Sequence, residues 1–189
     1  MVIHHQNRTG KPFESQSIAA WKAAVGHGVA LDIGAYTGLY AIIAAKAGST
    51  VYAFEPNPAV LRRLIENAGL NQVTLSAHCQ GVSDHRGSAA LVTKSAISLT
   101  SGGRLVDGNG VDLVRVDDLN LAGITAIKID VEGHECAVLR GAFQAISRDK
   151  PVIITEALND AALQDQRDIL EPIGYQFRTV DQWNVIWRV

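Results

Sequence analysis

The chain has little cysteine and no surplus of positive charge. Its two cysteines, Cys79 and Cys136, are not part of a CxxC pair and provide no metal framework. Lysine and arginine number 17 against 19 aspartate and glutamate, a formal net charge of −2 with histidine neutral. This balance provides no basic surface for nucleic acid or an anionic membrane. We therefore expect no nucleic-acid and no membrane partner.

Long apolar runs and several familiar catalytic motifs are also missing. No stretch approaches the roughly 20 apolar residues that a membrane helix requires, and the polar N-terminus lacks the apolar region of a secretory signal. The sequence has no HExxH, GxSxG or GxGxxG pattern, which excludes the usual zinc-protease, nucleophile-elbow and dinucleotide signatures. The expected compartment is the cytoplasm.

What the sequence has is an alternation of short β-branched runs and longer amphipathic runs. Its 189 residues, of which 47% are hydrophobic, predict one globular domain. We expect a helical extension over residues 1–28 and a core over 29–189. Strands are predicted at Val29–Ile33, Thr50–Phe54, Val73–Ala77, Ala126–Val131, Pro151–Thr155, Tyr175–Thr179 and Val185–Val189. Helices are predicted at about Ser15–Val25, Leu39–Ala47, Ala59–Leu70, His134–Ile146 and Asp160–Ile173, the first capped near Ser15 or Ser17.

This order predicts an α/β fold with a mostly parallel sheet and helices on both faces. The last two strands are separated by too few residues for a parallel crossover, so they should form an antiparallel hairpin at one edge. Trp183 and Trp187 are expected to pack this hairpin, although an exposed aromatic there could serve a dimer contact. In the less regular segment Ser83–Val116, HRGSAALV and VDLVRV could pair as short strands.

The first two predicted strands end in acidic and glycine-containing turns. ALDIGAYTGLY follows a GxxxG spacing rather than the pyrophosphate-binding GxGxxG, and AFEPNP follows about 20 residues later. A carboxylate inside the first turn would repel a dinucleotide's phosphates, but it suits the cationic S-adenosylmethionine. A carboxylate after the second strand can accept hydrogen bonds from two ribose hydroxyls. The candidate cofactor residues here are Asp32, Gly34, Ala35, Gly38, Glu55 and Pro56.

A third turn adds Val82, Ser83 and Asp84. An acid at this place could accept a hydrogen bond from an adenine amino group, with Val82 packed on the ring. An ordinary Asx or Ser turn explains the same residues equally well.

The densest polar cluster lies in IKIDVEGHE, where alternation places Lys128, Asp130 and Glu132 on one side of a strand. Because burying unpaired charges is costly, these groups should pair with each other or line a cleft. Glu156, at the end of the next strand, opens onto the same crevice. The candidate catalytic residues are Asp130, Glu132, His134 and Glu156, with Asp130 also a candidate cofactor contact.

The motifs DIGAYTGLY, FEPNP, VSD and IKIDVEGHECAVLRGA together resemble the FkbM family of S-adenosylmethionine-dependent methyltransferases, over roughly Val29–Glu156. The resemblance implies the seven-stranded, Rossmann-like class I methyltransferase fold. It also implies O-methylation of a hydroxyl on a sugar, natural product or similar small molecule. By motif position, the resemblance makes Asp32, Gly34 and Gly38 the cofactor loop, Glu55 the ribose ligand and Asp84 a candidate adenine contact. It places Asp130, Glu132 and His134 beside the transferred methyl group.

Methyl transfer to a hydroxyl requires alignment of the reactants and a base. Asp130 and Glu156 could hold a divalent metal, but without a third ligand a metal is not expected. Two alternatives remain open: a nicotinamide-dependent oxidoreductase, which the missing GxGxxG and the presence of Asp32 disfavour, and a non-catalytic binding module. The sequence does not identify the oligomeric state.

Overall fold

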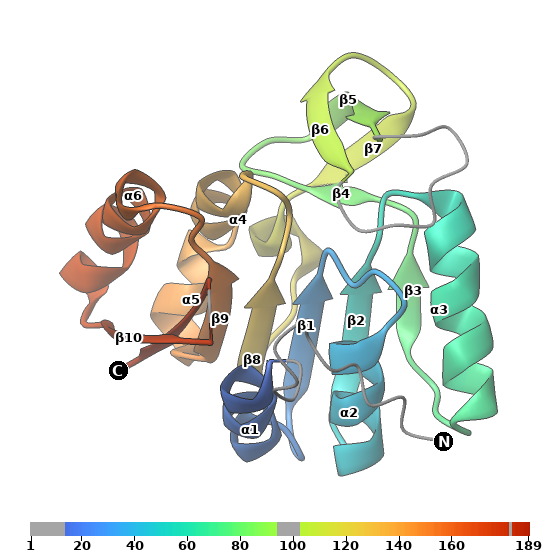
Figure 1. Cartoon of the computed structure of the whole chain (residues 1–189), viewed down its shortest axis with the longest axis horizontal. Coiled ribbons are helices and arrows are strands. Elements are labelled where there is room, and N and C mark those ends of the chain that lie inside the picture. The colour runs from blue at the N-terminus through green and yellow to red at the C-terminus, as the bar shows by residue number, and fades with distance from the viewer. Residues whose placement is uncertain (1–13, 94–102, 182) are drawn as a thin grey trace.

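The computed structural model describes residues 14–93, 103–181 and 183–189 and contains two sheets (Figure 1). The larger sheet has the order β10-β11-β9-β8-β1-β2-β3. Only β11 runs antiparallel to its neighbours, and the other adjacent strands are parallel. The strands are β1 (Val29–Ile33), β2 (Thr50–Phe54), β3 (Ser76–His78), β8 (Ile124–Ile129), β9 (Val152–Glu156), β10 (Gln176–Val180) and β11 (Asn184–Arg188). The predicted seven-stranded α/β fold with an antiparallel terminal hairpin is confirmed.

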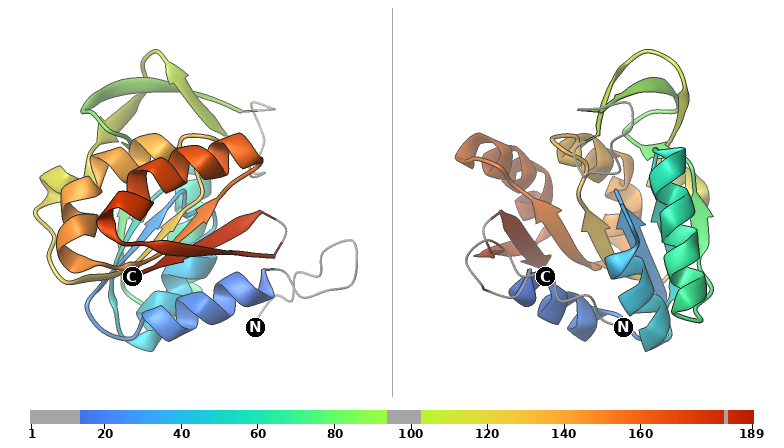
Figure 2. Two further views of the ribbon diagram at one scale, coloured as in Figure 1. Left: turned by 90° about the vertical axis from the view of Figure 1, so that its left-hand side faces the viewer. Right: turned by 45° about the vertical axis from the view of Figure 1, so that its right-hand side comes forward.

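Helices cover both faces of this sheet (Figure 2). The first group consists of α1 (Ser15–Ala24), α2 (Leu39–Ala47) and α3 (Pro58–Leu70), and the second of α4 (Glu135–Gly141), α5 (Phe143–Asp149) and α6 (Asp160–Leu170). Two 3-10 turns, η1 (Val116–Leu119) and η2 (Glu171–Ile173), complete the helical segments that the structure describes.

Strand alternation separates two hydrophobic cores. In β1, Leu31 packs on the side of α4–α6, and Ala30 packs on the side of α1–α3. The small side chains of Ala30, Ala53 and Ala126 are fully buried on the latter side, so the helices there can lie close to the sheet. Asp32 shares this face with Ala30, which places its carboxylate against α2.

A small second sheet lies beyond the carboxyl ends of the main strands (Figure 1). Its order is β4-β7-β5-β6, made of β4 (Gly81–Val82), β5 (Gly87–Val92), β6 (Arg104–Asp107) and β7 (Val111–Val114). The predicted pairing of HRGSAALV with VDLVRV is confirmed by the antiparallel β5–β7 pair. Among the described residues, no helix is long and apolar enough to cross a membrane.

Three local predictions are wrong. The single helix expected over His134–Ile146 is broken at Ala142, and the carboxylate of Asp117 caps the second half by accepting the N–H groups of Gln144 and Ala145. The third strand begins at Ser76, because the N–H of Val73 donates to Ala68 and so closes α3 instead.

The third correction concerns the start of α1, whose N-cap is Glu14 rather than a serine. Asp181, in the turn between β10 and β11, supplies the cap from another part of the chain. Its carboxylate accepts the backbone N–H groups of Gln16 and Ser17 and the Ser17 hydroxyl, the last at 2.6 Å. The N-terminal helix is thereby tied to the terminal hairpin.

The contact between α4 and the chain after β4 can be tested at Gly141. A Cβ here would overlap the backbone carbonyl of Ser83, so Gly141→Ala should lower the free energy of unfolding by about 1–3 kcal/mol. Gly69→Ala is the control, because a Cβ there meets no atom within 4 Å, and it should stabilise by about 0.4–1 kcal/mol. Urea unfolding measures both, and a Gly141→Ala protein as stable as the wild type would contradict this packing.

Candidate active site

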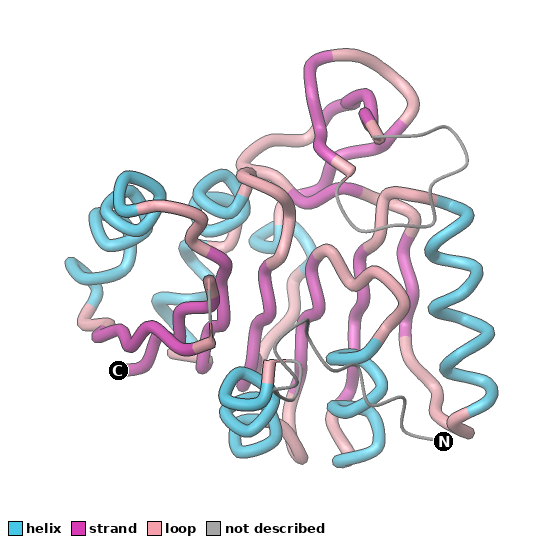
Figure 3. The backbone as a smooth tube through the Cα atoms, viewed as in Figure 1, coloured by secondary structure: helices cyan, strands magenta, loops and turns pink. Residues whose placement is uncertain are grey.

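A crevice of about 1700 Å³ opens where the parallel strands end. The loops after β1, β2 and β8 gather at this end of the sheet (Figure 3), as expected for ligand sites in open α/β sheets. Most predicted site residues line the crevice, namely Asp32, Gly34, Ala35, Glu55, Pro56, Val82, Asp130, Glu132 and Glu156. The structure does not place Gly38, Ser83, Asp84 or His134 among the described lining residues.

The turn after β1 depends on two glycines. Gly34 has a φ of +79°, and a Cβ there would overlap the carbonyl oxygen of Asp130. Its N–H donates to the Phe54 carbonyl at 2.9 Å, so the turn is held between its two neighbouring strands. Gly38, with a φ of +91°, is the N-cap of α2 and lies against Leu64. Only glycine combines these backbone angles with such close packing.

Asp32 is 2% exposed, and its carboxylate accepts the N–H of Ala41 at 2.8 Å. Burial raises its pKa from 3.8 to about 7, against the opposing effects of the Lys128 ammonium and the Ala41 N–H. Lys128 is the register partner of Asp32 on β8, so the two side chains share one face of the sheet. This aspartate shapes the wall of the crevice and binds protons near neutral pH.

Lys128 is 1% exposed, and its ammonium lies 3.2 Å from the Asp130 carboxylate and 5.3 Å from the ring centre of Tyr40. Burial favours the neutral amine, but the surrounding carboxylates of Asp130, Glu14 and Asp32 outweigh this effect and raise the Lys128 pKa above 10.5. The amine therefore stays charged. Tyr40 in turn donates its hydroxyl to Glu14 at 2.6 Å.

Glu55 is 9% exposed at the end of β2. Its Oε2 accepts the N–H of Tyr36 at 3.0 Å, and its Oε1 accepts the N–H of Asn57 at 2.9 Å. These bonds favour the ionised carboxylate, but burial outweighs them and raises the pKa of Glu55 above 4.5. Each carboxylate oxygen retains acceptor capacity for a further donor in the crevice.

Asp130, Glu132 and Glu156 form an acidic wall at the ends of β8 and β9. Burial and the charge of Asp130 raise the pKa of the half-buried Glu156 to about 7. Glu132 has a φ of +55°, an uncommon backbone angle outside glycine. The Glu135 carboxylate stabilises this bend by accepting the N–H groups of Val131 and Gly133.

Ser83, Asp84 and His134 belong to a separate polar group beside the crevice. His134 Nε2 lies 2.9 Å from the hydroxyl of Ser83, which is fully buried. Burial lowers the pKa of His134 below 6.5. The Asp84 carboxylate contacts His85 at 2.8 Å and Arg140 at 3.3 Å. This group connects β4 to α4.

Within the described ranges, no group of three or more histidine, cysteine, aspartate or glutamate side chains is arranged to hold a metal ion. Asp130 pairs instead with Lys128.

The comparison with known proteins is decisive at the level of family. The Methyltransferase FkbM domain matches residues 32–183. The chain belongs to this methyltransferase family. The hexuronic acid methyltransferase AglP of Haloferax volcanii is 30% identical over 130 residues, which cover 65% of this chain and 53% of that protein. The chain thus spans about half the length of this curated relative.

Solved structures share the FkbM chain's fold. The methyltransferase FkbM of Methylobacillus flagellatus matches with a TM-score of 0.62 and 23% identity over 87% of this chain and 44% of its own. The precorrin-6y C5,15-methyltransferase of Geobacter metallireducens matches with a TM-score of 0.59 and 15% identity over 100% of this chain and 98% of its own. The predicted class I methyltransferase fold is confirmed.

Sequence reasoning missed several residues of this FkbM crevice. Tyr40, Glu14 and Trp183 all line it, and Lys128, which was grouped with the acidic cluster but given no role, is its most buried charge. Trp187 packs the hairpin as predicted, with no exposed surface, but Trp183 is 46% exposed and does not. A tryptophan beside the polar turn DQ, before the apolar run of the last strand, was the available signal.

The raised pKa of Asp32 predicts how stability depends on pH. The folded state holds this proton more tightly than the unfolded state, so the free energy of unfolding falls as pH rises from about 4 to about 7. Asp32→Asn keeps an oxygen acceptor for the N–H of Ala41. This variant should lose the decrease in the free energy of unfolding between pH 4 and 7, which is on the order of 4 kcal/mol at about 1.4 kcal/mol per pKa unit. Urea unfolding at pH 4, 5, 6 and 7 measures the slope.

Asp149→Asn is the control, because Arg148 lowers the pKa of Asp149 below 3.8. Its stabilising effect is already complete above about pH 4, so this variant should lose stability but keep the wild-type slope between pH 4 and 7. A wild-type slope in Asp32→Asn would show that its buried carboxyl is not the source of the pH dependence.

Proposed function

We propose that this FkbM-family chain transfers a methyl group from S-adenosylmethionine to a hydroxyl on a sugar, natural product or similar small molecule. The observation that carries the proposal is that the Gly34 turn, the anchored Glu55 carboxylate and the acidic wall border one crevice. The relative AglP, which is 30% identical over the shared region, is a hexuronic acid methyltransferase, and this supports a small-molecule acceptor.

The residues present suit the chemistry of this cofactor. Gly34 and Ala35 would lie against it, because both line the crevice at the turn after β1. Glu55 would accept hydrogen bonds from the two ribose hydroxyls, since both of its oxygens are already held by backbone N–H groups. We assign the adenine to the side of Pro56 and Val82. The neighbouring pair Ser83 and Asp84 stays a proposed contact for its amino group, and Gly38 holds the turn in place.

S-adenosylmethionine, when bound, supplies a methyl group on a positively charged sulfur. The carboxylates of Asp130 and Glu132 would make the surroundings of that charge favourable, and the Lys128 ammonium holds the Asp130 carboxylate in place through a 3.2 Å contact. Glu156 is our candidate for the general base, because it lines the crevice and its pKa of about 7 suits proton removal near neutral pH. His134 is the second candidate, but its Nε2 lies against Ser83.

Two other functions were open from the sequence. Membership of a methyltransferase family disfavours a nicotinamide-dependent oxidoreductase. A non-catalytic binding module would keep the fold and lose the chemistry, whereas this chain keeps Glu55, Asp130 and Glu156 in one crevice. Calorimetry with S-adenosylmethionine and NAD, followed by transfer of a labelled methyl group to a panel of hydroxyl compounds, separates these possibilities. Tighter binding of NAD, or cofactor binding without transfer, would overturn the proposal.

Glu55 provides the first functional prediction. Glu55→Ala removes the acceptor for the ribose hydroxyls and should weaken S-adenosylhomocysteine binding about 10- to 100-fold by calorimetry. Glu66→Ala is the matched control, because Glu66 is an exposed glutamate of α3 outside the described lining of the crevice, and its affinity should equal that of the wild type. Equal affinities for all three proteins would remove Glu55 from the cofactor site.

Glu156 provides the second functional prediction. As a base it must be ionised, so kcat/KM should rise with pH and level off above about 7. Glu156→Gln should lower kcat by about 10²- to 10⁴-fold and abolish this rise, while cofactor affinity stays unchanged. His134→Gln is the comparison and should keep the wild-type pH profile. If His134→Gln loses the rise and Glu156→Gln keeps it, the base is His134.

A further inference from the structure

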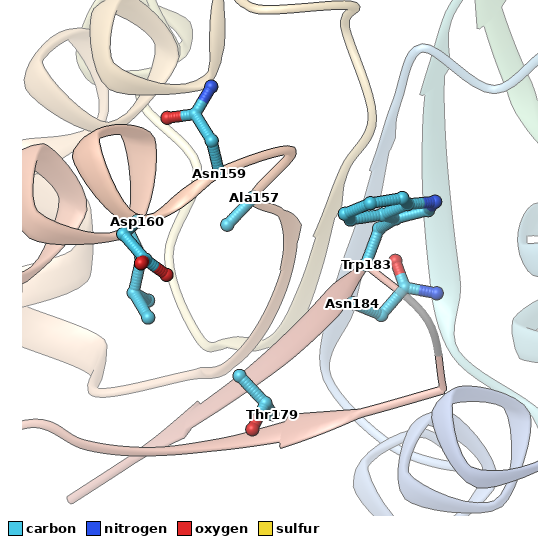
Figure 4. A pocket seen from close by; sticks show the side chains of 7 residues that line it. Ala157, Asn159, Asp160, Thr179, Trp183 and Asn184 are labelled. Atoms are coloured by element: carbon cyan, nitrogen blue, oxygen red, sulfur yellow. The ribbon is translucent and has the colours of Figure 1, made fainter.

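The crevice continues past Glu156 toward the turn that joins β10 and β11. Trp183 follows this turn and lines both the crevice and a smaller hollow of about 170 Å³ (Figure 4). It is 46% exposed, whereas Trp21 and Trp187 have no exposed surface. An aromatic face that is open to solvent between two cavities is a platform on which a flat or ring-shaped ligand can pack.

Polar groups that can bind hydroxyls surround this platform. Asn184 is 5% exposed and lies directly opposite Glu156 in the β11–β9 register, so both side chains leave the same face of the sheet. The side-chain amide of Asn184 has no hydrogen-bond partner among the described side chains. It also has none among the described backbone groups outside the strand pairs of β11. Figure 4 shows this amide next to the indole of Trp183. The Asn184 amide atoms are not among the fully buried polar atoms without a partner, so they open onto the hollow that the residue lines, where a ligand can complete their hydrogen bonds.

The opposite side of the hollow offers further polar groups. Asn159 uses its Oδ1 to cap α6 through the N–H of Ala162 at 2.9 Å, which leaves its amide N–H groups for another acceptor. Thr179 and Asp160 also line the hollow. The lining thus combines hydrogen-bond donors and acceptors with one exposed aromatic ring.

The charges of the described lining residues are mostly negative. The crevice has the carboxylates of Glu14, Asp32, Glu55, Asp130, Glu132 and Glu156, and the ammonium groups of Lys22, Lys46 and Lys128. The ammonium of Lys128 is buried against Asp130, and no arginine occurs among the described residues that line either cavity. Proteins usually bind a ligand carboxylate through the two parallel N–H donors of arginine, and this site shows no such group.

We propose that Trp183, Asn184 and Glu156 form the acceptor subsite, and that it takes an uncharged, polyhydroxylated ring such as a neutral sugar and rejects sugar acids. The proposal rests on the methyl-transfer function proposed above and names its acceptor class. The ring's C–H face stacks on the indole, and its hydroxyls bind the Asn184 amide and the Glu156 carboxylate. A uronate carboxylate at the same place meets Glu132 and Glu156, and this like-charge repulsion selects against it. The acceptor then differs from the one in the name of the AglP relative.

Tryptophan fluorescence tests the subsite without turnover, because Trp183 is the only tryptophan with exposed surface. The full chain, with and without S-adenosylhomocysteine, is titrated with methyl glycosides of glucose, galactose and mannose and with the matching methyl glycosides of their uronic acids. We expect a saturable change in emission, at concentrations at least about tenfold lower for one or more neutral glycosides than for the matching uronate. Trp183→Phe should lose the change in emission and keep most of the affinity, measured by calorimetry.

Turnover with the best neutral glycoside tests specificity. Trp183→Ala should raise KM for the acceptor about tenfold or more, with little change in kcat or in the affinity for S-adenosylhomocysteine, and Trp183→Phe should restore most of the loss. Phe143→Ala is the matched control, because Phe143 is a 40% exposed aromatic of α5 outside both cavities. In Glu132→Gln, the affinity for the uronate should rise relative to the affinity for the neutral glycoside. The same relative rise is expected for the wild type at 1 M salt, because salt screens the charges.

The outcomes separate the two proposals. Failure to bind S-adenosylhomocysteine, or to methylate any hydroxyl compound, sinks the methyl-transfer function, and the fluorescence titration of the free protein still tests the subsite. Three results overturn the subsite while leaving the methyl-transfer function standing, provided that the cofactor binds. They are tighter binding of uronates than of neutral glycosides, no binding of any glycoside, and a wild-type KM in Trp183→Ala.

Discussion

The crevice depends on the interaction between the buried ammonium of Lys128 and the carboxylates that surround it. A charge with 1% exposure is costly unless it is compensated, and here Asp130 contacts it directly while Asp32 and Glu14 contribute from nearby. The same ammonium reduces the repulsion between the carboxylates of Asp32 and Asp130 where β1 and β8 lie side by side. Tyr40 carries the arrangement outward, since its ring lies under the ammonium and its hydroxyl binds Glu14. Replacing this one lysine by an apolar residue would leave a group of like charges without a counter-ion.

The backbone around this charge is as constrained as the side chains. The carbonyl of Asp130 occupies the space where a side chain at Gly34 would lie, so the end of β8 and the turn after β1 can only meet at glycine. The N–H of Asp130 donates to the Ile33 carbonyl at 2.9 Å, which extends the β1–β8 pairing up to the edge of the crevice. Gly34 and Asp130 are therefore placed by contacts between neighbouring strand ends, as accurate positioning of reactants requires.

Local patterns explain which parts of this structure could be predicted. Val29–Ile33 and Thr50–Phe54 were predicted at their observed bounds because buried parallel strands are short β-branched runs that end in turn residues. The cap of α1 could not be predicted from local sequence, because Asp181 lies 164 residues from Ser17 in the chain. Lys128 was recognised as part of a polar cluster, but its partners Tyr40 and Glu14 come from other elements. Sequence spacing indicates which residues share a face, and it does not indicate which distant groups complete it.

The acidity of the crevice also determines what it can hold. Burial raises the pKa of both Asp32 and Glu156 to about 7, and neighbouring carboxylates add to this effect. A ligand that brings positive charge stabilises the ionised forms and so displaces protons, and its binding becomes stronger as pH rises through 7. A ligand that brings negative charge does the opposite, because it raises these pKa values further and requires protonation before it binds. In the function proposed above, a cationic methyl donor and an uncharged acceptor would together leave Glu156 ionised, which is the state that a general base requires.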